Sequence, residues 1–404
     1  GELRPDFAKV MERMRRLRAE ISVHDSAARF QNLGVDVFLG DATFLDRETI
    51  EVGGARLRFR KAVIATGARA FVPQVEGLDR VSYLTNETLF GLTELPARLL
   101  IVGGGPIGCE MAQAFQRLGS AVTLAEVSPR ILPREDADTA AIVQHALADD
   151  GVQFHFESRL QRVEHAGTAI RAQFERGGEA VQVETDALLL AVGRVPNVDG
   201  LRLEAGGIAY DTRTGVVVDN TLRTTNPAVF ACGDVCQAHK FTHAADAAAR
   251  IVLRNALFPF LPKARLSKVV VPWCTYTDPE IAHVGLSEQD AAHAGIAIDS
   301  VCVPMDRVDR ALLDGDDDGL LKVHLAKGKD RILGATLVSA HAGESIGVLT
   351  SAIAHGLGLR QLGSVVFPYP TQAEAIKKAA DAHARARLTS EAQKLLAGFF
   401  RWKR

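Results

Sequence analysis

The chain has 404 residues, which is enough for two or three domains with a core in each. Its formal net charge is -2 and 24% of its residues are charged, a balance that offers no extended basic surface to nucleic acid or to an anionic membrane. The longest apolar runs, such as residues 187–192, are much shorter than a membrane span, and no secretory leader pattern opens the sequence. Five widely spread cysteines do not fit a secreted disulfide framework. We therefore expect a cytoplasmic protein that acts on small molecules, with no nucleic-acid or membrane partner.

The first third of the chain predicts a helix and then short strands. Apolar residues recur at three- and four-residue spacings over residues 6–33, which indicates one amphipathic helix. Short β-type runs such as VDVFLG follow over residues 35–65, and a proline-bearing link continues through Pro96. Residues 98–126 then predict a strand, a glycine turn, an amphipathic helix and a second strand, followed by hairpin-like strands to residue 192.

The rest of the chain predicts helices and a hairpin. Alanine-rich residues 242–257 indicate a helix, residues 320–339 a strand hairpin, and residues 343–356 and 372–386 two more helices. The acidic run at residues 314–319 has the beginning of a calcium-binding loop, but leucine stands where the bidentate glutamate is needed. We interpret this run as a solvated turn, and the sequence predicts no metal site.

The glycine turn in LIVGGGPIGCE has the spacing G-x-G-x-x-G at Gly103, Gly105 and Gly108. The first glycine permits a tight turn after the strand, the second permits close approach of a pyrophosphate, and the third permits close packing of helix and strand. Glu126 ends the following strand, where a carboxylate accepts a bond from a ribose 2′-hydroxyl and repels a 2′-phosphate. The pattern favours NAD, although Arg130 lies close enough in sequence to soften that preference and NADP is not excluded.

Four further segments occur in a particular order: VIATGARAFVP at 63–73, LLLAVGRVPN at 188–197, TTNPAVFACGDV at 224–235, and FPYPTQAEAIKKAA at 367–380. With the glycine turn, they resemble the pyridine nucleotide-disulfide oxidoreductases over essentially the whole chain. The resemblance implies an α/β fold, with Rossmann-like FAD- and NAD(P)-binding domains and a C-terminal α+β dimerisation domain. The domains implied are a first FAD-binding part at 1–92, the NAD(P)-binding domain at 93–195, a second FAD-binding part at 196–265, and the dimerisation domain at 266–404.

The resemblance also assigns roles to individual residues. On the nicotinamide side the expected cofactor-binding residues are Gly103, Gly104, Gly105, Pro106, Ile107, Gly108, Glu110, Glu126, Leu160 and Gly193. On the flavin side they are Ala42, Thr66, Gly67, Ala68, Gly233, Asp234, Phe241, Thr242 and His243. Asp234 is implied as the acceptor for the flavin ribityl hydroxyls, and the helix that begins near His243 as the support under the flavin ring. Three of these residues have an alternative to cofactor contact. Glu110 is alternatively a solvated helix residue, and Ala42 and His243 are alternatively packed core residues.

Cys232 and Cys236 flank the Gly-Asp pair, and their spacing is C-x3-C, whereas the family's redox pair is C-x4-C. We expect both thiols to be inert, since reactivity needs an accessible, electropositive setting. The family's first FAD-binding strand-turn-helix and its redox pair have no counterpart here, so we interpret the chain as a fragment rather than a working variant. An inserted cysteine pair near the C-terminus, typical of mercuric reductases, is also absent.

Tyr369 stands where most disulfide reductases of the family have the histidine of a His-Glu proton shuttle, with Glu374 as the implied partner. The resemblance is therefore nearest to mercuric reductase-like members. It implies a homodimeric flavoprotein that passes hydride from NAD(P)H through FAD to a disulfide, a metal ion or another small acceptor, with Tyr369 and Glu374 as catalytic residues. The alternatives are an FAD enzyme of the same fold without disulfide chemistry, such as a transhydrogenase or quinone reductase, and a non-catalytic dimeric NAD-binding fragment.

Overall fold

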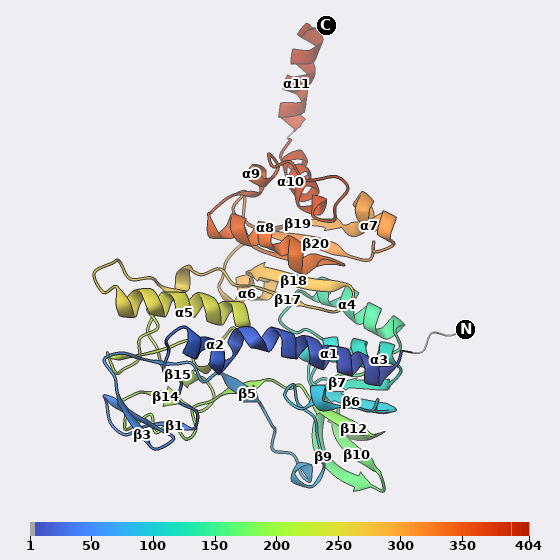
Figure 1. Ribbon diagram of the computed structural model, residues 1–404. Helices are drawn as coiled ribbons and strands as arrows, with labels where there is room; N and C mark the ends of the chain where they lie inside the picture. The colour runs from blue at the N-terminus through green and yellow to red at the C-terminus, as the bar shows by residue number, and fades with distance from the viewer. Residues whose placement is uncertain (1–4, 389, 404) are drawn as a thin grey trace. The chain divides into compact units, whose positions relative to one another are not determined.

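The computed structural model describes residues 5–388 and 390–403, apart from the side chains of residues 390–392 (Figure 1). Contacts between Cα atoms divide the chain into two compact units. Unit 1 contains the chain up to Pro129 together with Gly151–Val269. Unit 2 contains Arg130–Asp150 together with the chain from Val270 onward. The chain therefore passes from unit 1 into unit 2 at Arg130 and returns to unit 1 after Asp150.

A four-stranded parallel sheet of order β12-β6-β7-β8 forms one part of unit 1. Strands β6, β7 and β12 are mostly buried, and Leu100 and Ile101 have no exposed surface, because helices or chain cover both faces of a parallel sheet. The edge strand β8 is more exposed. A three-stranded antiparallel sheet of order β11-β10-β9 packs beside it through a shared apolar core. The elements are β6 (Arg98–Val102), α3 (Pro106–Leu118), β7 (Ala121–Ala125), β8 (Gln153–His155), β9 (Ser158–Ala166), β10 (Ala169–Arg176), β11 (Glu179–Thr185) and β12 (Ala187–Leu190).

The other part of unit 1 consists of short strands and three helices. A parallel pair, β4 with β16, and an antiparallel pair, β5 with β13, join chain segments that lie more than 120 residues apart. The strands are β1 (Ala42–Phe44), β2 (Thr49–Val52), β3 (Ala55–Arg58), β4 (Ala62–Ile64), β5 (Ala68–Ala70), β13 (Arg194–Pro196), β14 (Tyr210–Asp211), β15 (Gly215–Val216) and β16 (Val229–Ala231). The helices are α1 (Phe7–Ser22), α2 (Ala27–Asn32) and α5 (Thr242–Leu257), with 3₁₀ turns η1 (Val23–Asp25), η2 (Leu78–Arg80), η3 (Leu89–Gly91), η4 (Gly233–Val235) and η5 (Leu266–Lys268).

Two expectations about the first part of the chain are wrong. The predicted helix over residues 6–33 is interrupted at η1, because the Ser26 hydroxyl accepts a bond from Arg29 N and so starts a new helix. The run VDVFLG at residues 35–40 is not a strand, since strand pairing in the described chain begins only at Ala42 and Val35, Phe38 and Leu39 stay exposed. The apolar character of that run alone suggested the strand.

Unit 2 is built on a five-stranded antiparallel sheet of order β17-β18-β21-β20-β19. Helices α8 and α10 bury alanine, leucine and isoleucine side chains against this sheet, which forms the unit's core. The strands are β17 (Pro272–Thr275), β18 (Glu280–Gly285), β19 (Ile298–Pro304), β20 (Leu320–Ala326) and β21 (Ile332–Ser339). The helices are α4 (Ala137–Asp149), α6 (Glu288–His293), α7 (Asp309–Asp314), α8 (Ala342–Ala354), α9 (Leu359–Leu362), α10 (Glu374–Ala386) and α11 (Ser390–Lys403), with the 3₁₀ turn η6 (Met305–Arg307).

The predicted hairpin and the predicted helices of the second half are confirmed, and α5 has the predicted bounds. The acidic run lies in the turn between α7 and β20, as expected. Among the described residues, no helix is both long and apolar enough to cross a lipid bilayer.

Candidate functional site

The glycine turn lies between β6 and α3, and two of its glycines are required by packing. Gly103 has φ of +112°, and a Cβ atom there would lie 2.5 Å from the carbonyl oxygen of Ala191. A Cβ atom on Gly108 would collide with the carbonyl oxygen of Gly103. Gly105 differs, because no atom lies within 4 Å of the position that its Cβ atom would take. The turn is therefore packed against the protein on one side and open at Gly105 on the other.

Glu126 completes this turn from the end of β7. Its side chain is buried, with Oε2 accepting a hydrogen bond from Gly104 N at 2.6 Å and Oε1 accepting one from Ser128 N at 2.8 Å. The sequence placed this carboxylate near the turn, and the hydrogen bond to Gly104 provides the contact. Two backbone donors fix the orientation of the acceptor beside the start of α3.

The other residues expected on the nicotinamide side lie around the same sheet. Pro106, Ile107 and Glu110 lie in the first turns of α3, where Pro106 is exposed and Glu110 is half-buried. Leu160 lies on β9 and is buried in the core that this strand shares with the parallel sheet. Gly193 has φ of +117° and open space around its Cβ position, so its conformation explains the glycine there.

The expected flavin-side motifs meet at the ends of short paired strands. Strand β16 runs parallel to β4, so Gly233 and Asp234 follow one strand at the same edge where Thr66 and Gly67 follow the other. Gly233 has φ of +77°, which favours glycine. Its amide donates to Gln237 Oε1 at 2.9 Å, which closes the turn η4 around Asp234.

Arg194 connects three of the predicted motifs. Its Nη1 atom lies 2.8 Å from Asp234 Oδ2, and its Nη2 atom donates to the carbonyl oxygen of Ala68 at 2.8 Å. Both side chains are mostly buried, with 31% of Arg194 and 13% of Asp234 exposed. Within the described chain, the buried Nε atom of Arg194 has no hydrogen-bond partner. Sequence reasoning named the neighbouring Gly193 and missed Arg194, although the arginine belongs to the same GRVPN segment.

Asn197, at the end of that segment, holds the turn after β4 in place. The Thr66 hydroxyl donates to Asn197 O at 2.8 Å, and Asn197 Nδ2 donates back to Thr66 O at 2.9 Å. Asn197 N also donates to Gly67 O at 2.9 Å. These bonds fix the backbone of Thr66–Ala68 while the Thr66 side chain stays mostly exposed.

The start of α5 approaches the same region. Lys240 Nζ donates to the carbonyl oxygens of Asp234 and Gln237, at 2.9 and 3.2 Å, and so links η4 to the residues that precede the helix. Phe241 is the N-cap residue, and its ring stacks on that of His243 with centroids 5.4 Å apart. Thr242 and His243 are exposed, so the alternative of a packed core histidine is wrong. Ala42 is also exposed, at the start of β1 in a separate three-stranded sheet, so the alternative of a packed core residue is wrong for it as well.

Cys232 and Cys236 are free thiols, one buried and one half-buried. Burial raises the pKa of Cys232, and burial together with the neighbouring Cys232 raises the pKa of Cys236 to about 12. Neither group forms a thiolate near neutral pH, and the thiolate is the reactive form. These observations support the prediction that the pair is inert.

Tyr369 and Glu374 lie in unit 2. The Tyr369 hydroxyl donates to Asp309 Oδ2 at 3.0 Å, and this bond raises the pKa of the phenol, which is 69% exposed. Glu374 is the first residue of α10, and Lys378 Nζ lies 3.6 Å from its Oε1 atom and 4.0 Å from Asp309 Oδ1. Lys378 thus bridges the two acidic groups beside Tyr369.

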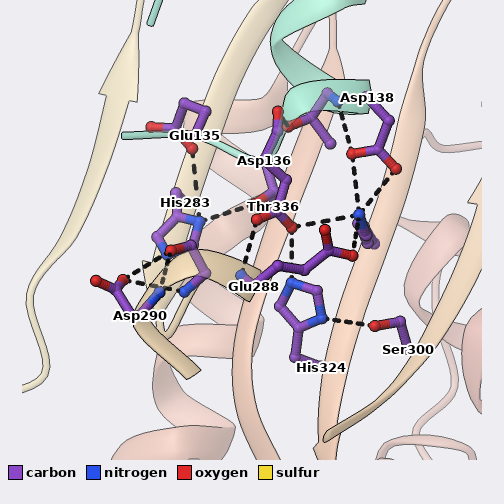
Figure 2. Close-up of polar contacts among 12 residues, drawn as sticks. Glu135, Asp136, Asp138, His283, Glu288, Asp290, Ser300, His324 and Thr336 are labelled. Atoms are coloured by element: carbon purple, nitrogen blue, oxygen red, sulfur yellow. Dashed lines mark hydrogen bonds and ion pairs between the residues drawn. The ribbon is translucent and has the colours of Figure 1, made fainter. Parts of the chain in front are cut away.

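A second polar cluster was not predicted from sequence, and it lies under α4 in unit 2 (Figure 2). His324 Nε2 and Asp136 Oδ2 are 2.8 Å apart, and both side chains are buried. Lys322 Nζ lies 3.4 Å from Asp136 Oδ2, 2.8 Å from Asp138 Oδ2 and 2.6 Å from Glu288 Oε1. Burial alone raises the pKa of Asp136, but bonds from His324 and Glu288 N and the charge of Lys322 lower it to about 2.

The same cluster continues toward β17. Trp273 Nε1 donates to Glu135 Oε1 at 2.6 Å, and the Trp273 ring stacks on His283 at 4.5 Å. Burial raises the pKa of the Glu135 carboxyl. Asp136, Glu288 and His324 offer ligand atoms within 4.8 Å of one another, but the ammonium of Lys322 already supplies the compensating positive charge there. The cluster fastens residues 135–138 to the sheet of unit 2.

These two units define an α/β protein whose first unit has a dinucleotide-type glycine turn and whose second has an α+β sheet. Residues 4–249 match the family described as pyridine nucleotide-disulphide oxidoreductase, and residues 271–380 match the dimerisation domain of that family. The chain belongs to this family. It is by membership an FAD-dependent oxidoreductase that uses a pyridine nucleotide.

Named relatives agree with this assignment. The chain is 34% identical to a mercuric reductase of Lysinibacillus sphaericus, over 93% of this chain and 68% of that protein. It is 38% identical to a mercuric reductase of Streptomyces lividans, over 90% of this chain and 76% of that protein. Against a mercuric reductase of Bacillus cereus, the aligned part covers 59% of the relative's length. The structure of the HOCl-induced flavoprotein disulfide reductase RclA from Escherichia coli matches with a TM-score of 0.84 and 30% identity, over 94% of this chain and 86% of that one.

Proposed function

We propose that the protein oxidises NADH and delivers the electrons, through FAD, to a small acceptor of the disulfide or metal-ion class. When bound, the two cofactors supply the redox chemistry, from nicotinamide to flavin and from flavin to acceptor. The protein binds them, orients them and sets the local charge. The observation that carries the proposal is the junction at Arg194, where three sequence motifs from distant parts of the chain meet.

The nucleotide would bind at the glycine turn. Open space at Gly105 is what a pyrophosphate needs for close approach, and the amides at the start of α3 favour an anion there. Gly103, Gly104 and Gly108 shape the backbone, and Pro106 and Ile107 begin the helix. Glu110, Gly193 and Leu160 are proposed to line the nicotinamide and adenine ends.

A preference for NAD is supported by two side chains. The Glu126 carboxylate is held in place by Gly104 N and Ser128 N, so it is preorganised to accept a ribose 2′-hydroxyl and to repel a 2′-phosphate. The Arg130 guanidinium donates to the carbonyl oxygens of Ile131, Leu132, Pro133 and Glu135. Because its guanidinium already donates these hydrogen bonds, Arg130 is a poor ligand for a 2′-phosphate.

The flavin would be held at the junction in unit 1. Asp234 would accept hydroxyl bonds from the ribityl chain, while Arg194 keeps that carboxylate oriented. The buried Nε atom of Arg194 is a donor that the described chain does not satisfy, as expected where a ligand oxygen belongs. Thr66, Gly67, Ala68 and Gly233 form the backbone of the site, and Phe241, Thr242 and His243 present the N-terminus of α5. Ala42 is proposed to contact the adenine end.

Tyr369 and Glu374 are proposed to act across a homodimer, in keeping with the matched dimerisation domain. The raised pKa of Tyr369 makes the phenol a hydrogen-bond donor at neutral pH rather than a proton shuttle. A role in binding the acceptor follows better from this chemistry than general acid-base catalysis. We further propose that the protein acts in the cytoplasm. We also propose four domain segments with the boundaries 1–92, 93–195, 196–265 and 266–404.

The test is a steady-state comparison with the FAD-bound protein, in which NADH and NADPH are paired in turn with oxidised lipoamide, Hg(II) and a soluble quinone. We expect NADH to give the higher kcat/KM, and turnover with the disulfide or Hg(II). Turnover with the quinone alone would instead favour the FAD enzyme without disulfide chemistry. The Cys232–Cys236 pair supports that alternative, because the raised pKa values of both thiols make this pair unsuited to disulfide chemistry.

A further inference from the structure

Helix α11 is amphipathic, and large apolar side chains on it are exposed. Leu395 is 75% exposed and Trp402 is 80% exposed, with Leu396, Phe399 and Phe400 also in contact with solvent. Leu395, Phe399 and Trp402 recur at four- and three-residue spacings and therefore share one face of the helix. With Lys394 and Gly398, they line a shallow groove on that face. Such an exposed aromatic stripe marks an interaction surface.

Basic side chains border this stripe. Lys394 and Arg401 are seven residues apart, so they lie on one side of the helix, along the edge of the aromatic stripe, and Lys394 also lines the groove. Lys403 lies over the ring of Phe399, with Nζ 5.4 Å from its centroid. Residues 392–404 contain no aspartate or glutamate. The helix thus combines apolar aromatic surface with positive charge, the pairing that an anionic lipid surface complements.

The sequence of α11 and its place in the chain narrow the choice of partner. Lys394, Arg401 and Lys403 interrupt its apolar residues, so the helix would lie in the membrane plane rather than cross the apolar core of a bilayer. The family's dimerisation domain ends at residue 380, before α11 begins.

We propose that α11 is a membrane-surface anchor, which inserts Leu395, Phe399 and Trp402 into the interface of an anionic phospholipid bilayer while Lys394 and Arg401 bind its headgroups. Trp402 suits this interfacial depth, because its ring is largely apolar and its indole N–H can bind water or a headgroup, while Leu395 and Phe399 supply apolar surface. A homodimer would present two such helices, and simultaneous engagement strengthens binding without any new contact. This inference does not depend on the acceptor of the proposed reaction.

The experiment is flotation of the FAD-bound protein with vesicles of phosphatidylcholine, with or without an equal share of phosphatidylglycerol. We expect binding to the mixed vesicles and at least about tenfold weaker binding to phosphatidylcholine alone. The double variants Phe399→Ser/Trp402→Ser and Lys394→Glu/Arg401→Glu should each lose about tenfold or more of the binding. Leu313→Ser, at a position on α7 that is 72% exposed, is the matched control and should bind like the parent protein.

Fluorescence locates the contact. The chain has two tryptophans, so a blue shift on addition of mixed vesicles that disappears in Trp402→Phe belongs to α11. FAD content and NADH oxidation should be the same in all variants, which separates loss of the anchor from loss of the fold or of the proposed reaction. Equal flotation of the parent and both double variants would overturn the proposal, as would no flotation of the parent. Higher oligomers that vanish in Phe399→Ser/Trp402→Ser would overturn it in favour of self-association.

Discussion

The two units place their polar groups in opposite ways. In unit 1 the polar residues lie at the ends of three-residue strands, and Thr66, Thr242 and His243 remain open to solvent. In unit 2 the strands β20 and β21 are seven and eight residues long. His283, His324 and Lys322 are buried there, and each lies against a buried carboxylate: His283 against Glu135, and His324 and Lys322 against Asp136. Figure 2 shows the two histidines with these acidic residues. A polar group that serves a ligand must be reachable from solvent, whereas one that serves the fold is buried with its partners. The difference separates candidate binding groups from structural ones.

The glycine turn gives the largest expected difference between a structural residue, Gly108, and a candidate binding residue, Gly105. Gly108→Ala should destabilise the protein by about 3 kcal/mol or more, because its Cβ atom meets the Gly103 carbonyl oxygen and the backbone must shift. Gly105→Ala places its Cβ atom in open space, so stability should hardly change while the KM for NADH rises about tenfold or more. Urea unfolding and initial rates measure the two effects. Equal loss of stability in both variants would refute the separation.

The charged cluster of unit 2 predicts an acid limit to stability. The pKa of Asp136 is lowered to about 2 in the folded protein, from its ordinary value of 3.8. A lowered carboxyl pKa stabilises the fold above the unfolded-state value, and this contribution of about 2 kcal/mol is lost as the pH falls from about 4 to about 2. Asp136→Asn should remove the contribution at pH 7.

Denaturant unfolding at a series of pH values measures this loss. Asp138→Asn is the control, because Asp138 binds the same lysine but is 49% exposed, and its removal should cost less than about 1 kcal/mol. If Asp136→Asn kept the full pH dependence of the parent protein between pH 4 and pH 2, the cluster would not be the source of that dependence.

Asp234 should affect flavin binding more than stability. Asp234→Asn removes the charged acceptor and weakens FAD binding by about tenfold, which corresponds to one charge-assisted hydrogen bond. Asp199→Asn is the matched control, since Asp199 also pairs with an arginine of unit 1, Arg69, but is 63% exposed. Fluorescence titration with FAD measures the affinity. Similar losses in both variants would show that the charge at Asp234 has no specific role.

Tyr369→Phe should have the smallest effect. The substitution removes one exposed hydrogen bond to Asp309, so unfolding should be almost unchanged. If Tyr369 contacts the acceptor, turnover falls a few-fold while reduction of the flavin by NADH keeps its rate. Stopped-flow measurement of the two half-reactions distinguishes these steps. A slower flavin reduction would mean that the tyrosine acts on the nicotinamide side instead.

Local patterns predicted much of the fold. Helix α5 and the glycine turn were placed correctly because periodicity and turn chemistry are written in adjacent residues. The break at residues 23–26 was missed, since one serine hydroxyl outweighed a continuous apolar period. The pair of Asp136 with His324 was also missed, because 188 residues separate the partners and no local pattern connects them.

The candidate sites show the same division. Gly193 and Asp234 were named from their motifs, but the arginine that joins those motifs, Arg194, became visible only when β13 and β16 were placed in space. A net charge of -2 over the whole chain also gave no sign of the basic, aromatic helix α11. The net charge is summed over all 404 residues, so it does not show the local positive charge of the 14 residues of α11.

The most direct test of the account is an anaerobic titration of the FAD-bound protein with NADH, followed by visible absorbance. The account holds that one unit binds both dinucleotides, so it predicts a yellow protein whose flavin absorbance is bleached by about one equivalent of NADH. A protein that stays colourless after incubation with FAD, or whose flavin absorbance NADH leaves unchanged, would contradict it.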